Sequence, residues 1–142
     1  MPFMQQPASA SGAEIWSDAP QFPSWADPSF YSDSGDLYMC FEAHTEETFT
    51  TVRFEGLIEM SIQPFTEENL GSHEFYKFGL KQYEFNILKN SSKISYWKAL
   101  NPTHWVITFQ DRTIDVIAKE CVIIAKAIPA KSQSEALLAA LK

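Results

Sequence analysis

The strongest constraint on the fold is a pair of apolar runs, residues 105–109 and 113–118, separated by the three polar residues 110–112. Both runs consist mainly of Val, Ile, Thr, Trp and Phe, which fit a pleated and partly buried surface. A connection of three polar residues is long enough for an antiparallel hairpin and far too short for a parallel crossover. We therefore predict a hairpin here, with Phe109 in the core.

Other parts of the chain repeat this period of two. Residues 37–43 alternate apolar and polar side chains, and residues 49–63 do so in a register that includes Gly56. The second run predicts one long strand that is bent or bulged at this glycine. Residues 83–87 predict a further strand, and the run that begins at Thr113 continues to residue 127, as one long or bulged strand.

The C-terminal residues carry the signal of a helix. Ser132 and Glu135 have the spacing of a capping box, and a helix is predicted from about Gln133. Residues 75–80 fit a short strand or an irregular link, and residues 93–100 fit a helix or a strand. Because the connections are short, the predicted class is α+β, mainly antiparallel β-sheet with a C-terminal helix and an aromatic and proline-rich N-terminal segment.

The first 35 residues divide into two parts. Residues 1–12 are small and polar and lack periodicity, which predicts a disordered arm. Residues 13–35 carry five large aromatic residues among three prolines. The prolines argue against regular strands, and the rings favour a segment pinned to the surface of the domain. Residues 13–142 are predicted to form a single globular domain, a length that supports a core of its own.

Charge is distributed unevenly along the chain. Residues 1–76 contain thirteen acidic residues and the single basic residue Arg53, whereas residues 77–142 contain five acidic and ten basic residues, within a total of −7. The ten basic residues are spread along the second half, which does not predict nucleic-acid binding. Such an asymmetry indicates what partners the surface favours, not which fold it covers.

The usual signatures of catalysis are absent from the sequence. It has five glycines and no glycine-rich phosphate loop or Gly-x-Ser-x-Gly motif, and its histidines lie about thirty residues apart without metal-ligand spacing. Catalytic residues, metal ligands and cofactors are therefore not predicted, and a non-enzymatic role is favoured, although a Ser-His-Asp site assembled in space stays open. With neither an apolar run of membrane-spanning length nor a secretory signal, a cytoplasmic protein without membrane contact is expected.

The acidic half supplies the functional hypothesis. Glu42, Glu55 and Glu59 lie on or beside predicted strands, and the last two are expected at the centre of a carboxylate face. Such a face favours a basic protein partner through complementary potential. The alternative is a small-ligand or catalytic domain with a pocket beside the sheet, and self-association is left open.

Two segments carry a family resemblance. Residues 52–56 after the strand near 37–41, and residues 104–113 with the strand behind them, look like segments of small uncharacterised bacterial α+β proteins. Some of these proteins resemble immunity proteins, which neutralise a toxin. The resemblance implies a bacterial binding protein, with an immunity-type inhibitor of a basic partner as its most specific form.

Overall fold

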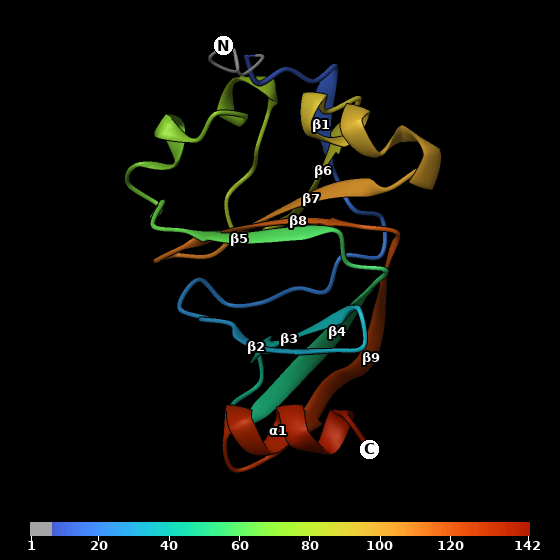
Figure 1. The fold of residues 1–142 in the computed structure, drawn as a ribbon. Coiled ribbons are helices and arrows are strands. Elements are labelled where there is room, and N and C mark those ends of the chain that lie inside the picture. The colour runs from blue at the N-terminus through green and yellow to red at the C-terminus, as the bar shows by residue number, and fades with distance from the viewer. Residues whose placement is uncertain (1–6) are drawn as a thin grey trace.

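Within residues 7–142, which the computed structural model describes, nine strands form two antiparallel sheets and one helix follows them (Figure 1). The five-stranded sheet has the order β1–β6–β7–β8–β5 and consists of β1 (Gly12–Ile15), β6 (Phe85–Lys89), β7 (Thr103–Thr108), β8 (Thr113–Ala118) and β5 (Glu59–Gln63). The four-stranded sheet has the order β2–β3–β4–β9 and consists of β2 (Ser29–Asp33), β3 (Asp36–Glu42), β4 (Thr48–Glu55) and β9 (Glu120–Pro129). The α+β class with a mainly antiparallel sheet is confirmed.

The main core lies between the two sheets and is rich in aromatic rings. The ring of Phe22 packs against Phe41, Phe85 and Phe109, with centroids 5.4, 6.1 and 4.7 Å apart. Phe109 is 2% exposed and lies in this core, so the predicted hairpin and the predicted burial of Phe109 are confirmed. Most of the strands send alternate side chains into this layer, which is the origin of the period of two.

The segment 13–35 is pinned by its rings, but it is not free of strands. Trp16 and Phe22 pack in the main core, whereas β1 and β2 begin and end this segment and pair with β6 and β3. The expectation that prolines exclude regular strands here was wrong, because all three prolines lie between the two strands.

The predicted long strand over residues 49–63 is two strands in different sheets. At Gly56, where φ is 63°, the chain leaves β4 and enters β5, which pairs with β8. The run 113–127 is divided in the same way, because β8 ends at Ala118 and β9 pairs with β4. The two crossings meet, since Lys119 N–H donates to the carbonyl of Glu55 at 2.9 Å. The alternation of apolar and polar residues therefore continues through a turn at which the chain passes from one sheet to the other.

Each sheet has an outer face that is partly covered. The helix α1 (Gln133–Ala140) covers part of the four-stranded sheet and begins as predicted, with Glu135 N–H donating to Ser132 Oγ at 3.1 Å. The outer face of the five-stranded sheet is covered by residues 64–84, which contain the 3₁₀ turns η1 (Leu70–Ser72) and η2 (Tyr76–Phe78). The ambiguous region near residues 93–100 is the 3₁₀ helix η3 (Ser92–Leu100).

The chain joins the fold earlier than the predicted arm allows. Ser9 exchanges hydrogen bonds with Ser92, and the N–H of Ser11 donates to the carbonyl of Lys89 at 2.8 Å. The expectation of disorder up to residue 12 is therefore corrected from Ser9 onward, and residues 1–6 lie outside the described residues. In the part of the chain that is described, no helix has the length and apolar character needed to cross a membrane.

Candidate functional site

Ionisable side chains lie together in two regions of the described chain. One is a buried network on the outer face of the five-stranded sheet, and the other is an open pocket beside the turn between β3 and β4. They differ in the contacts that their carboxylates make.

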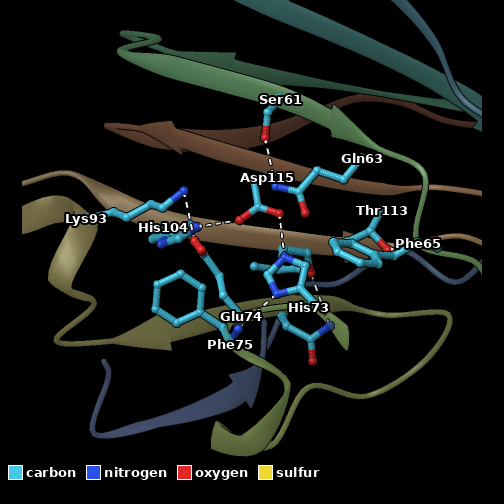
Figure 2. A network of polar contacts seen from close by, with 12 residues as sticks. Ser61, Gln63, Phe65, His73, Glu74, Phe75, Lys93, His104, Thr113 and Asp115 are labelled. Carbon is cyan, nitrogen blue, oxygen red and sulfur yellow. Dashed lines mark hydrogen bonds and ion pairs between the residues drawn. The ribbon is translucent and has the colours of Figure 1, made fainter. Parts of the chain in front are cut away.

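Asp115 is the centre of the buried network (Figure 2). Its Oδ1 lies 2.8 Å from Nε2 of His73, and its Oδ2 lies 2.9 Å from Nε2 of His104. β8 supplies the carboxylate, β7 supplies His104, and the covering segment 64–84 supplies His73. Both imidazole side chains are fully buried, so the carboxylate is enclosed by its two partners.

The outer hydrogen bonds of the rings define which nitrogen carries the proton. The N–H of Phe75 donates to Nδ1 of His73 at 3.0 Å, so Nδ1 is an acceptor and Nε2 is the donor to Asp115. Oγ of Ser91 lies 2.7 Å from Nδ1 of His104 and accepts from the N–H of Lys93 at 3.2 Å. Its hydroxyl proton is free to point at Nδ1, which gives His104 the same tautomer.

These contacts explain the acidity of Asp115. Burial raises the pKa of this carboxyl, but the hydrogen bonds that His104 and His73 donate to it outweigh burial and hold the pKa at about 2. Asp115 is therefore ionised at neutral pH, and both its oxygens have partners within the protein.

A very small cavity lies beside the network. It has a volume of about 10 Å³ and is lined by Glu59, Ser61, Lys93, His104, Asp115 and Ile117. That is roughly the room needed by one water molecule. Lys93 pairs with Glu74, Nζ to Oε1 at 2.9 Å, and although burial lowers the pKa of Lys93, its contacts with Glu74 raise it above the ordinary value. The cavity is suited to a bound water rather than to a substrate.

Ser91, His104 and Asp115 are the residue types of a nucleophilic triad, but their arrangement differs from one. In a serine hydrolase the hydroxyl meets Nε2 and the carboxylate meets Nδ1, whereas here the two nitrogens have exchanged partners. The Ser91 side chain also caps η3, and the residue is 2% exposed. The hydrogen bonds instead tie β7, β8, η3 and the segment 64–84 together.

The second region, which we call the Trp25 pocket, is open to solvent. It has a volume of about 290 Å³, and its lining residues are Trp25, Glu42, Ala43, His44, Thr45, Glu46, Glu47, Thr48 and Phe49. Trp25 is 62% exposed, and its Nε1–H donates to Oε2 of Glu42 at 3.2 Å. The lining contains three glutamates and neither lysine nor arginine. An aromatic face beside carboxylates is a suitable environment for a cationic side chain.

The structure separates the three predicted binding residues. Glu42 lies in the Trp25 pocket, whereas Glu55 lies at the far end of β4, paired with Arg53 at 3.0 Å and opposite Glu120. Glu59 begins β5 in the other sheet and lines the small cavity. The expected common face does not form, because the chain changes sheets between Glu55 and Glu59.

Two groups of residues were missed by sequence reasoning. Trp25 was treated as one of several rings that pack on the domain, and no local pattern separates it from Phe22. His73 and His104 show no metal-ligand spacing in the sequence, yet they meet Asp115 across 42 and 11 positions. One usable signal was an acid in the middle of the apolar run 113–118, since a carboxylate buried there needs partners.

Metal ligands and thiols are the remaining candidate groups among the described residues. No group of three or more His, Cys, Asp or Glu residues in residues 7–142 is placed to hold a metal ion. Cys40 and Cys121 are free thiols, and burial raises the pKa of both. Comparisons with protein families, with curated proteins and with solved structures find no match to this chain, so the interpretation of the site depends on its geometry.

Proposed function

We propose that this domain is a non-enzymatic binding protein that receives a basic segment of a partner protein in the Trp25 pocket. The observation that carries the proposal is the exposed Trp25, held by Glu42 beside Glu46 and Glu47. A lysine or arginine placed over the indole ring would gain a cation–π contact and meet carboxylates at the same time.

The pocket is formed by backbone that already has its own hydrogen bonds. The N–H of Ala43 donates to the carbonyl of Thr48 at 2.9 Å, and the N–H of Ala130 donates to the carbonyl of Glu47 at 3.1 Å. The glutamate side chains at the turn therefore project from a fixed frame, and binding loses less free energy to ordering than it would on a loose loop.

The alternative function, a ligand pocket beside the sheet, has weaker support. The cavity at the polar residues of the five-stranded sheet has the size of one water. An immunity-type inhibitor, acting in the bacterial cytoplasm on a basic toxin, is the more specific form of the proposal. It is supported by the acidic lining of the pocket and by the resemblance of two segments to small bacterial proteins, some of which resemble immunity proteins.

The test uses a fluorescently labelled peptide rich in lysine and arginine, with an acidic peptide of equal length as the comparison. Fluorescence anisotropy should show binding of the basic peptide that weakens with salt, because screening shortens the reach of charge to about 10 Å at 0.1 M. The double variant Glu46→Gln, Glu47→Gln should bind at least about tenfold more weakly.

A matched control removes two charges elsewhere. Asp18 and Glu68 are exposed acids of the same half of the chain, and the double variant Asp18→Asn, Glu68→Gln should bind nearly as well as the native protein. If both double variants lost the same affinity for the basic peptide, binding would depend on the net charge of the protein and not on the Trp25 pocket. A larger loss in the variant Glu55→Gln, Glu59→Gln would move the centre of binding to these two residues, which the sequence predicts as the centre of a carboxylate face.

A further inference from the structure

The helix η3 exposes an unusual number of large apolar side chains. Tyr96 is 86% exposed, Trp97 38% and Leu100 46%, and none of the nine residues of η3 is buried. In Figure 1 it is the yellow to orange coil that projects beyond β6 and β7, at the end of the molecule opposite α1. Exposed aromatic residues of this kind are typical of interaction surfaces.

The same helix is basic. Residues 92–100 include Lys93 and Lys98 and contain no acidic residue. Lys93 is paired with Glu74, while Lys98 lies in the last turn, one position after Trp97. η3 therefore combines an accessible ring and a cationic side chain, which is the chemistry that the Trp25 pocket suits.

The buried network fixes the start of η3. Ser91 caps the helix through the N–H of Lys93 and contacts His104, which is bound in turn to Asp115. The first turn is thereby tied to two strands of the sheet. A projecting segment that is held in this way can dock with a smaller loss of conformational entropy than a free loop.

We propose that η3 of one copy docks in the Trp25 pocket of a second copy, so that the protein associates head to tail. This inference rests on the proposed function, since it names the basic segment that the pocket receives. Charge complementarity selects the occupant: Lys98 would face Glu46 and Glu47, and Tyr96 would pack on Trp25. The pocket, at about 290 Å³, is near the lower end of the range of roughly 300–1,000 Å³ known for ligand pockets, which suits a few side chains.

The two surfaces belong to different parts of one molecule, so the contact is heterologous. Each copy that docks its η3 leaves its own pocket open for another copy. Unless the rotation between copies happens to close a ring, such a contact adds subunits as the concentration rises. The average mass of the native protein in solution is therefore expected to increase with concentration beyond that of a dimer.

Analytical ultracentrifugation of two complementary variants tests the proposal. The variant Glu46→Lys, Glu47→Lys loses the pocket but retains η3, and the variant Tyr96→Ser, Lys98→Glu loses η3 but retains the pocket. Each alone should be monomeric, while an equimolar mixture should form a dimer and stop there, since one intact contact remains. Circular dichroism of each variant establishes that it is folded, and Asp18→Lys, Glu68→Lys serves as the control that still associates.

The outcomes separate this inference from the proposed function. A native protein that stays monomeric at every concentration, yet binds the labelled basic peptide, would overturn self-docking and leave the basic partner elsewhere. Association that persists in both variants would overturn it as well, because another surface would then be responsible. If the native protein stayed monomeric and also failed to bind the labelled basic peptide, both this inference and the proposed function would be wrong.

Discussion

Asp115 and Glu42 are both carboxylates that accept a hydrogen bond from a ring nitrogen, and they differ in what remains free. Asp115 accepts from two imidazoles and is 5% exposed, so both its oxygens are satisfied inside the fold. Glu42 accepts from the indole of Trp25 in a pocket that is open to solvent. The first carboxylate is expected to stabilise the domain, and the second retains capacity for a partner.

The difference follows from the elements that carry the two side chains. Asp115 lies on β8, a central strand whose six residues are all buried, and the segment 64–84 covers it. Glu42 ends β3, next to a turn that has no covering segment over its exposed residues 44–47. If this comparison holds, substitutions in the buried network should reduce stability, and substitutions in the Trp25 pocket should reduce binding.

The largest effect is expected from Asp115→Ala. The change leaves the N–H groups of His73 and His104 buried without an acceptor, at a cost of about 3 kcal/mol of unfolding free energy. Urea denaturation measures it. Asp111→Ala, in the exposed turn of the same hairpin, is the control and should cost less than about 0.5 kcal/mol. A loss below about 1 kcal/mol for Asp115→Ala would contradict the stabilising role of the network.

The free energy of unfolding should depend on pH through the ionisation of Asp115. The pKa of Asp115 in the folded protein is about 2, below its ordinary value of 3.8, so the folded state favours the ionised form. The resulting stabilisation, about 2 kcal/mol, is complete above about pH 4 and is lost as the pH falls towards 2. Comparing the acid dependence of the native protein with that of Asp115→Asn isolates this contribution. Identical curves would show that the pKa of Asp115 is the same in the folded and the unfolded protein, which contradicts the prediction.

A smaller loss of stability is expected from Ser91→Ala. This change removes the cap of η3 and the partner of His104 Nδ1, and should cost about 1–2 kcal/mol. Because Ser91 and Asp115 contact the same ring, their losses should not add in the double variant. Ser95→Ala, on the exposed part of η3, is the comparison. Full additivity in a denaturation cycle would mean that the two residues act separately.

The smallest effect on stability belongs to the pocket. Trp25→Ala and Glu42→Gln should each change the unfolding free energy by less than about 0.5 kcal/mol, since both side chains face solvent. Binding of the labelled basic peptide should fall at least about tenfold in Trp25→Ala. Trp25→Phe keeps an aromatic face and should recover part of the affinity. A pocket variant that unfolds easily, or that binds normally, would break the contrast between the two regions.

Local patterns in the sequence were sufficient for most of the secondary structure. The hairpin of β7 and β8 follows from alternation over a few residues, and the start of α1 follows from Ser132 and Glu135. These features depend on neighbours within about four positions, which the sequence displays directly. The class of fold could be inferred because the short connections permit antiparallel pairing and exclude most alternatives.

What the sequence could not determine depends on contacts between distant residues. Phe22 and Trp25 lie three positions apart in one proline-rich segment, yet Phe22 is in the core and Trp25 is 62% exposed. Likewise, alternation over residues 49–63 predicts one strand with a single apolar face, but the partner strand changes at Gly56 because the chain turns there. Composition and alternation therefore determined the β7–β8 hairpin, most of the residues that form strands, the charge asymmetry and the helix cap by themselves. The tertiary structure alone placed Asp115 between two histidines and Glu42 in an open pocket, because burial and pairing there depend on segments up to 42 residues apart.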